Sequence, residues 1–426
     1  MTQTATELPD NETVLVVDLD GTLCRTDTLF EVLFALVTTN PFSLLALPKW
    51  LGKGRAELKA HLADLKIMAA DSLPMNPHVI EAVEEARATN RPTALVSAAD
   101  HRQVTAIAEA TGLFDQAYGS AEGRNLKGDE KAAFLIEQFG EGKYDYIGDS
   151  PADVPVWASA RQALTVQANA SLKRAAQTAN SNTQHLDPPV GRNWAILHAM
   201  RPHQWTKNLL LFLPAVAAHN ASNLLPIILG FIAFCLTASA VYVINDLTDL
   251  AADRAHPRKR NRPFAAGTLS IQTGLFMATG LCVLAFIFGL FTGNPLFLIV
   301  QLAYLVLTFA YSLWLKRKLV VDVLTLAGLY TIRILAGAAA ATVVLSPWMM
   351  GFSIFIFLAL AAVKRQAELT DQLVTQRESS GRAYEVDDLP VLRSIAISAA
   401  NTAVLVLALY INSPEVQTLY ASPFLL

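Results

Sequence analysis

Hydrophobic positions divide the chain into two parts with different patterns. In the second part, long apolar segments follow one another with short polar connections between them. Most of them approach the length of about 20 residues that an α-helix needs to cross a bilayer. The pattern predicts an all-α, multi-span transmembrane bundle over residues 194–426, with apolar segments at 208–218, 224–244, 271–291, 295–315, 322–345, 347–363 and 391–411.

The first part alternates short buried strands with amphipathic helices. Apolar runs at 13–17, 93–96 and 144–147 have the length and composition of buried strands. Between the first two runs, residues 29–37 and 44–51 are apolar and residues 56–68 are amphipathic, so we expect a helical cap over about 24–92. We therefore predict an α/β, Rossmann-like domain over residues 11–168.

A polar stretch separates the two parts. Residues 169–193 contain Pro188-Pro189 and show neither helical nor strand periodicity, which predicts an interdomain linker. The overall content of 53% hydrophobic and 16% charged residues is then the average of a soluble domain and a membrane domain. The three cysteines, Cys24, Cys235 and Cys282, have no metal-binding spacing, and residues 1–15 lack the features of a signal peptide.

Charge in the connections predicts the orientation of the bundle. Lys and Arg are found at 254–262, 316–318 and 364–382, and are absent from the alternate connections at 219–223, 292–294 and 346. The positive-inside rule places the basic connections and the first domain in the cytosol, at the cytoplasmic membrane. We expect the lipid bilayer and no nucleic acid as partners, and homo-oligomerisation stays open.

Candidate chemistry in the first part begins where its first strand ends. Asp18-Leu19-Asp20-Gly21-Thr22 follows the strand directly. The strand period puts Asp18 and Asp20 on the same side of the carboxyl edge, where open α/β sheets carry their sites. Two carboxylates can act there as nucleophile and general acid.

Three further stretches accompany this motif. Ser97 follows the second strand, Lys127 and Lys131 open an amphipathic helix, and the last strand runs into 148–153, which contains Asp149 and Asp153. Together, in this order, the four stretches resemble the motifs of haloacid dehalogenase (HAD)-type phosphatases. We prefer Lys131 to Lys127 because Leu135 follows it at the helical interval.

The resemblance implies a role for each of these side chains. Asp18 would attack the phosphoryl group and form an aspartyl-phosphate, while Asp20 would protonate the leaving oxygen and later activate water. Ser97 and Lys131 would hold the phosphate. One Mg²⁺ would be bound by Asp18 and Asp149, with Asp153 completing the acidic site.

An acidic motif follows the apolar segment 224–244. Asp246, Asp249 and Asp253 are spaced three and then four apart, which on a helix puts them on one face. Like charges this close repel unless a cation lies among them, and such ligands suit Mg²⁺ with a bound phosphate. The basic run behind the motif would by itself indicate only a positive-inside loop. The triplet favours a metal–diphosphate site, with phosphate donors in Arg254, Arg258, Lys259, Arg260 and Arg262.

A second resemblance rests on this motif. The stretch from Asn245 to Asp253, with Arg262-Pro263 and Ala266-Gly267 behind it and 201–208 (RPHQWTKN) upstream, resembles the UbiA superfamily of intramembrane prenyl-group transferases. Within it, the stretch is most similar to the decaprenyl-phosphate phosphoribosyltransferases. The resemblance implies that the three aspartates are catalytic and hold one or more Mg²⁺, and that donor phosphates are bound by Asn245, Arg258, Lys259 and Arg262.

Tyr311-Ser312 with Lys316, Lys318 and Asp322 resembles the superfamily's second motif. The two lysines would bind phosphate and Asp322 would bind metal. Many aromatic prenyltransferases carry two acids at this motif, whereas this chain has Asp322 alone, which favours the phosphoribosyl branch. The resemblance also implies more spans than the sequence holds, so we expect a C-terminal truncation.

Two further cations lie in the membrane part. Arg333 is predicted in the middle of a span, where a charge is costly and has a partner. We predict that it meets a phosphate, rather than forming an ion pair or snorkelling to the interface. For Lys207, the sequence favours two interpretations equally: binding phosphate and anchoring the chain at the membrane interface.

The predicted function is therefore bifunctional. The membrane domain would transfer 5-phosphoribosyl from 5-phosphoribosyl diphosphate to a polyprenyl (decaprenyl) phosphate, and the HAD domain would remove the 5′-phosphate of the product, a precursor of cell-wall arabinan. One alternative is an aromatic prenyltransferase fused to a phosphatase of unrelated substrate. The other is a non-catalytic first domain that senses phosphometabolites or acts as a scaffold.

Overall fold

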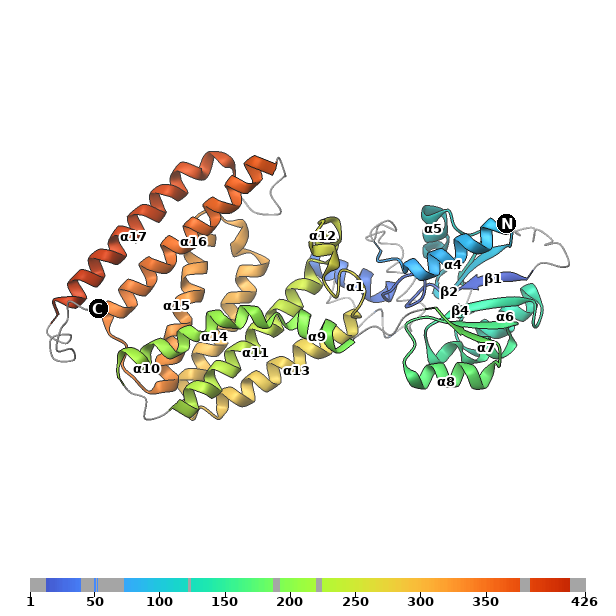
Figure 1. Ribbon diagram of the computed structural model, residues 1–426, viewed down its shortest axis with the longest axis horizontal. Helices are drawn as coiled ribbons and strands as arrows, with labels where there is room; N and C mark the ends of the chain where they lie inside the picture. Colours follow the sequence, from blue (N-terminus) through green and yellow to red (C-terminus); the bar gives the residue numbers. More distant parts are fainter. Residues whose placement is uncertain are drawn as a thin grey trace. The chain divides into compact units, whose positions relative to one another are not determined.

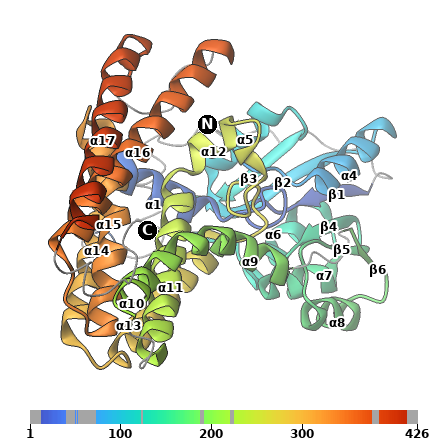
Figure 2. The same ribbon diagram turned by 60° about the vertical axis from the view of Figure 1, so that its left-hand side comes forward.

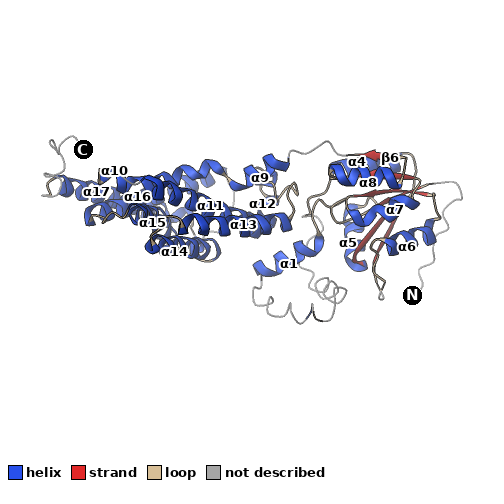
Figure 3. Cartoon of the chain, turned by 90° about the horizontal axis from the view of Figure 1, so that it is seen from below, coloured by secondary structure: helices blue, strands red, loops and turns tan. Residues whose placement is uncertain are grey.

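A computed structural model describes residues 13–39, 50, 52, 73–121, 124–186, 192–219, 224–375 and 384–413. The chain divides into two compact units. The first unit comprises Met1–Ala199 and Asp246–Phe276, and the second comprises Met200–Asn245 and Met277–Leu426. All named strands belong to the first unit, and the second is helical (Figure 3).

The first unit contains a six-stranded parallel sheet with the order β3-β2-β1-β4-β5-β6. The chain order reverses beside β1, which lies between β2 and β4, so the carboxyl end of β1 is the switch point at which such sheets bind ligands. This agrees with the predicted Rossmann-like fold. The strands are β1 Val14–Val17, β2 Thr93–Asp100, β3 Gln116–Ser120, β4 Tyr144–Gly148, β5 Gln162–Thr165 and β6 Thr183–His185.

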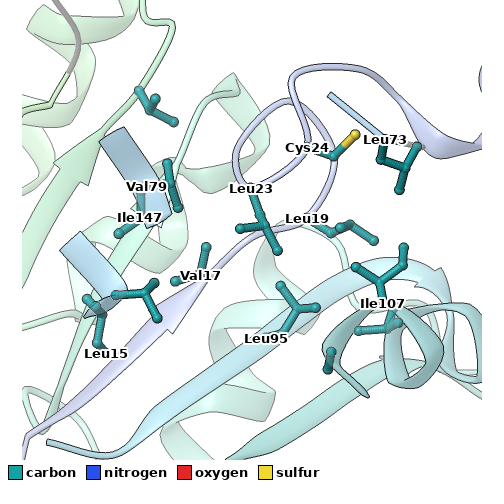
Figure 4. Close-up of a cluster of buried hydrophobic side chains, with 14 of the residues drawn as sticks. Leu15, Val17, Leu19, Leu23, Cys24, Leu73, Val79, Leu95, Ile107 and Ile147 are labelled. Atoms are coloured by element: carbon teal, nitrogen blue, oxygen red, sulfur yellow. The ribbon is translucent and has the colours of Figure 1, made fainter. Parts of the chain in front are cut away.

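Both faces of the sheet are buried. Leu15 and Val17 point into one hydrophobic cluster (Figure 4), while Val14 and Val16 belong to the other. This alternation explains why β1 reads as a continuous apolar run. The first cluster is covered by α4 (Pro77–Ala88) and α5 (His101–Thr111), and the second by α6 (Asp129–Phe139), α7 (Val154–Ser159) and α8 (Ala170–Ala179).

The predicted linker is wrong over most of its length. Residues 170–179 form α8 and residues 183–185 form β6, which pairs with β5. Leu172 and Ala176 of α8 are buried in the second cluster. The helix is polar on its other face and β6 is short, so neither gave a clear period. The first domain thus extends to about residue 186, followed by α9 (Arg192–Met200).

Part of the predicted cap is visible. Residues 28–39 form α1 (Thr28–Thr39), in agreement with the apolar segment predicted there. The predicted segments 44–51 and 56–68 lie outside the described residues, apart from Trp50. The stretch at 73–76 returns the chain to the domain, where the Arg25 amide donates to the Pro74 carbonyl at 2.9 Å.

Six helices in the described part of the chain are long and apolar enough to cross a membrane. Helices α16 and α17 lie side by side (Figures 1 and 2). α16 continues twelve residues past the predicted end of its segment, so the first part of the predicted basic connection 364–382 is helical. The helices are α11 (Leu224–Thr248), α13 (Ile271–Leu290), α14 (Pro295–Leu313), α15 (Val321–Ala341), α16 (Pro347–Thr375) and α17 (Leu389–Ile411).

The first predicted apolar segment has a different form. Residues 208–212 are the end of a 3₁₀ helix, Pro202–Phe212, and residues 213–217 form the five-residue α10 (Leu213–Ala217). A 3₁₀ helix rises about 2.0 Å per residue against about 1.5 Å for an α-helix, so residues 208–217 reach roughly 18 Å, less than the bilayer core of about 30 Å.

Candidate active sites

The carboxyl ends of β1 and β4 bring three acidic side chains together. Asp18 follows β1, and Asp149 and Asp153 follow β4. One carboxylate oxygen from each lies within 4.8 Å of the others, a separation that one hard cation can bridge. These are the residues from which the sequence predicted an Mg²⁺ site.

Lys131 supplies the cation of this cluster. Its Nζ donates to Asp18 Oδ1 at 2.8 Å and to the Tyr146 hydroxyl at 2.9 Å. Tyr146 in turn donates to Asp153 Oδ1 at 2.8 Å. Lys131 is buried, whereas its rival Lys127 is exposed. The structure thus places Lys131, and not Lys127, beside Asp18.

Burial and mutual repulsion act on the acids. Burial raises the pKa of Asp18 to about 7, against the opposing charge of Lys131 and with a further contribution from Asp153. Burial and the charges of Asp18 and Asp153 also raise the pKa of Asp149 well above its usual range. One lysine does not balance this acidic cluster, so the donor set fits a divalent cation.

Gly21 lets the motif loop pass close to Asp149. Its φ is +79°, and a Cβ at this position would lie 2.1 Å from Asp149 Oδ2. The next residue, Thr22, is buried and donates its hydroxyl to Asp149 Oδ1 at 3.2 Å. The Asp-Gly-Thr sequence therefore orients the acid of another strand.

Asp20 lies two residues after Asp18 and makes contacts of its own. Its Oδ1 accepts the Thr28 amide at the start of α1 at 2.7 Å, and its Oδ2 accepts the Ser97 hydroxyl at 3.4 Å. Asp20 is only half-buried. The structure thus brings Ser97 and Asp20 together, and their roles in the reaction stay predictions.

The acidic motif of the transferase part is also in the first unit. Arg262 donates to Asp246 Oδ1 at 3.2 Å and to Asp253 Oδ2 at 2.5 Å, and Lys259 lies 3.8 Å from Asp253 Oδ1. Both acids are buried. Two carboxylates of the triplet therefore share one guanidinium, in the place where a metal and a diphosphate were predicted.

The expectation of three aspartates on one continuous helix is wrong in detail. α11 ends at Thr248 and α12 (Leu250–Ala255) begins after a break at Asp249, whose backbone lies outside the helical range. Asp246 and Asp253 still lie close enough to bind the same guanidinium of Arg262. Asp249 is half-buried and Arg258 is exposed on the following loop.

In the second unit, a buried guanidinium lies in the middle of α15. Arg333 donates to Asn208 Oδ1 at 2.9 Å, to the Tyr304 hydroxyl at 3.0 Å and to the Leu329 carbonyl. It also stacks over the rings of Tyr304 and Tyr330. None of the carboxylates that the structure describes forms an ion pair with it. The positive charge is hydrogen-bonded but not neutralised.

More cations surround this position. Lys207 is half-buried and lies within electrostatic reach of Lys364, Arg333 and Arg201. Arg201 packs over the Tyr242 ring and has a left-handed backbone, φ +52° and ψ +57°, which is costly for a residue other than glycine. Four cations gathered in the bundle are a candidate anion site.

Asp322 does not present a free carboxylate. It is fully buried and pairs with Arg365 at 2.7 Å, and it accepts the Tyr311 hydroxyl at 2.9 Å. Arg365 is itself buried within α16. Asp322 is thus held in an internal ion pair in this structure, and its role as a metal ligand stays a prediction.

The remaining predicted residues differ in their exposure to solvent. Asn245 and Lys316 are half-buried and Lys318 is exposed on the connection between α14 and α15. An apolar cavity of about 370 Å³ opens between α15 and α16 and is a candidate for a lipid chain. It is lined by Leu324, Ala327, Gly328, Thr331, Leu335 and Leu358, among others.

Several functional residues escaped sequence analysis. Tyr146 was part of a predicted strand, and only the structure shows that its hydroxyl contacts Lys131. Asn208 was in the quoted 201–208 motif without a role, and Tyr304 carries no local signal. Arg365 was assigned to a loop, and a longer helical period through 364–375 could have placed it on the buried face of α16.

Comparisons with known proteins agree with both motif sets. Residues 209–425 match the UbiA prenyltransferase family, and residues 15–157 match the haloacid dehalogenase-like hydrolases. A protein of Sinorhizobium fredii, y4nM, is 36% identical over 97% of this chain and 81% of its own length. Decaprenyl-phosphate phosphoribosyltransferase of Mycolicibacterium smegmatis is 37% identical over 43% of this chain and 59% of its own length.

Solved structures resemble each part. A UbiA homologue from Archaeoglobus fulgidus, bound to DMAPP and Mg²⁺, has 17% identity and a TM-score of 0.45, and covers 53% of this chain and 81% of that chain. A phosphoserine phosphatase complex has 17% identity and a TM-score of 0.29 over 39% of this chain and 91% of that chain.

The UbiA match covers half of the chain, and the relationship to the Sinorhizobium protein extends over nearly all of it. The chain therefore belongs to the UbiA prenyltransferase family, as a multi-pass membrane enzyme with a haloacid dehalogenase-like hydrolase domain at its N-terminus.

Proposed function

We propose that the N-terminal domain hydrolyses a phosphate monoester through Asp18. The observation that carries this proposal is the contact of Lys131 with Asp18 inside the Asp18–Asp149–Asp153 cluster. A carboxylate held by a buried lysine and two further acids is arranged for attack on a phosphoryl group. Asp20, outside the cluster, is placed to give a proton to the leaving oxygen.

Each residue of the hydrolase site has its own role in the proposed reaction. Asp18 forms the covalent bond to phosphorus as the ester oxygen leaves, and Lys131 and Ser97 hold the phosphoryl oxygens. Asp20 then accepts a proton from the water that releases the phosphate. Bound by Asp18, Asp149 and Asp153, Mg²⁺ would neutralise the cluster and draw charge from the phosphoryl oxygens.

The test is phosphate release from a small phosphate ester by the full chain in detergent. Asp18→Asn should abolish release, since amide nitrogen and oxygen are poor nucleophiles, and Lys127→Ala should leave it unchanged. Equal activity of Asp18→Asn and the parent chain would refute the assignment.

For the membrane domain, we propose transfer of a 5-phosphoribosyl group from 5-phosphoribosyl diphosphate to a polyprenyl phosphate. The carrying observation is the un-neutralised Arg333 beside Asn208, with Lys207, Arg201 and Lys364 nearby. A buried cation without a carboxylate is costly, and an anionic phosphate would relieve that cost. The similarity to the phosphoribosyltransferase of M. smegmatis supports the same substrates.

The acidic motif would bind the leaving diphosphate. Asp246, Asp249 and Asp253 fit one or more Mg²⁺, which would stabilise the charge that develops on the diphosphate. Arg262 and Lys259, already bound to the acids, would turn to the phosphate oxygens. The lipid phosphate would attack the anomeric carbon of the ribose as the diphosphate leaves.

We also propose a membrane orientation for the chain and an order for the two reactions. By the positive-inside rule, the basic connections favour a cytosolic position for the acidic motif and the hydrolase domain. The hydrolase would then remove the 5′-phosphate of the lipid product, since tethering in one chain raises the effective concentration of the second site. Radiolabelled donor should put label into the lipid phase, and Asp249→Ala should prevent this. Label that enters lipid only from a prenyl diphosphate would favour an aromatic prenyltransferase.

A further inference from the structure

A buried ion pair joins two segments of the first unit that are 223 residues apart. Glu31 lies in the first turn of α1, and Arg254 lies in α12 directly after Asp253. The guanidinium binds both carboxylate oxygens, at 2.6 and 3.1 Å. The side chains are 6% and 11% exposed. The contact is thus a desolvated, two-pronged pair between the hydrolase domain and the loop of the transferase motif.

Such a pair depends on both partners. Desolvating a carboxylate or a guanidinium is costly, and removal of one partner leaves the other charged and buried. The two-pronged geometry also fixes direction, because the planar guanidinium must face the carboxylate. The pair therefore fixes the orientation of α1 on the loop. An ion pair on the surface contributes too little free energy to do this.

A second contact joins the same parts independently. Gly267, at the end of the basic loop, has φ +68°, and a Cβ there would lie 2.5 Å from Arg25 Cβ and 3.3 Å from Pro74 Cγ. Arg25 and Pro74 are themselves hydrogen-bonded, at the two ends of the cap insertion. The loop thus touches the base of the cap as well as α1.

Each end of the ion pair reaches a proposed site. On one side, the first amide of α1, on Thr28, holds Asp20 of the hydrolase motif. On the other side, Arg254 also donates to the Ala265 carbonyl at 3.2 Å and so closes the basic loop that contains Lys259 and Arg262. These two basic residues bind Asp253.

We propose that Glu31 and Arg254 are positioning residues that dock α1 on the loop after the acidic motif and thereby hold that loop in its diphosphate-binding conformation. The hydrolase domain is then an integral support of the transferase motif, and not only an enzyme on a tether. The kinetic part of this inference rests on the proposed transferase function, while the docking itself does not.

The test is a charge exchange in the full chain in detergent. Glu31→Arg and Arg254→Glu are made singly and together, and Glu137→Arg, which breaks the exposed Glu137–Arg124 pair, is the control. Hydrogen exchange of residues 250–268 reports docking without any substrate. The KM for 5-phosphoribosyl diphosphate, measured in the transfer reaction, reports the conformation of the loop.

Each single change should accelerate exchange in 250–268 and raise the KM about tenfold, a typical coupling between sites. The exchanged pair should restore both, and the control should alter neither. Glu31→Gln keeps the shape and removes the charge, so it should accelerate exchange even if Glu31→Arg fails to fold. Unchanged exchange in Glu31→Gln, or an exchanged pair that restores neither property, would overturn the proposal. If the parent chain transfers no label, the proposed function fails, and the exchange measurement still decides the docking.

Discussion

At the scale of single residues, Gly21 shows how closely the hydrolase motif is packed. The side chain of any other residue would enter the space of Asp149 and would also require a left-handed backbone. Displacement of a metal ligand by about 1 Å is enough to cost roughly a hundredfold in turnover.

We therefore expect Gly21→Ala to lower phosphate release about a hundredfold. Gly112→Ala is the matched control, because Gly112 has φ +61° and its added Cβ would meet no atom within 4 Å. Both variants put alanine at a positive φ, so equal loss of activity in the two would show that backbone strain, and not the Asp149 contact, is responsible.

The crowded acids predict a response to metal. Mg²⁺ should raise the unfolding temperature of the hydrolase domain, and at a concentration of a hundred times its dissociation constant the gain is about 2.7 kcal/mol. At pH values above the raised pKa of Asp149, Asp149→Asn should be more stable than the parent chain without metal, because there it removes one repelling charge from beside Asp18 and Asp153. It should gain less from Mg²⁺. Thermal unfolding with EDTA and with Mg²⁺ checks both statements, and an unaltered gain would contradict the proposed ligand.

A variant of Arg333 tests the proposed phosphoribosyl transfer separately. Arg333→Gln keeps a hydrogen-bonding group near Asn208 and Tyr304 but removes the charge, so transfer should fall by about 10²-fold while the chain stays folded. Arg393→Gln, at an exposed position in α17, should have little effect. Normal transfer by Arg333→Gln would exclude a phosphate at this position.

Sequence analysis located most of the acids but not their partners. Asp18, Asp149 and Asp153 follow strands, so the topology of a parallel sheet brings them together. The partners Tyr146, Arg365 and Glu31 depend on which side chain faces which across the fold, and no local pattern encodes that. Asp322 illustrates the consequence, because its acidity was visible and its neutralisation by Arg365 was not.

At the scale of elements, the long apolar helices and the strands next to motifs were predictable because their hydrophobic pattern continues over enough residues to be recognised. Helix α8 and strand β6 were not, since they are short, polar on one side and depend on packing against β5. The 3₁₀ helix Pro202–Phe212 was not predicted, because hydropathy indicated only the apolar segment 208–218 and does not report the type of helix.

The docked loop predicts a difference between two glycines. Gly267→Ala should destabilise the first unit, because the added Cβ would displace Arg25 or Pro74. Gly293→Ala shares a positive φ of +75° but has no neighbour within 4 Å, so it should show only the cost of strain, about 1 kcal/mol. Hydrogen exchange of 250–268 separates the two, and equal exchange in both variants would argue against a close contact at Gly267.

At the scale of the whole molecule, the chain joins two phosphate chemistries. In the proposed account, a hydrolase domain alone would act on any accessible ester, and a transferase domain alone would release a phosphorylated lipid. One chain with both can convert the lipid in two steps, with the second site always present at high effective concentration. The proposed account therefore predicts one product that neither domain makes by itself.

A donor with two labels tests this most directly. 5-Phosphoribosyl diphosphate would carry ¹⁴C in the ribose and ³²P in the 5′-phosphate, and the full chain in detergent would receive Mg²⁺ and polyprenyl phosphate. The account predicts ¹⁴C in the lipid phase and ³²P released as inorganic phosphate, with both labels retained in the lipid of Asp18→Asn. Absence of ¹⁴C from the lipid phase of the parent chain would contradict the transfer, and ³²P lost equally by Asp18→Asn would contradict the role of the hydrolase domain.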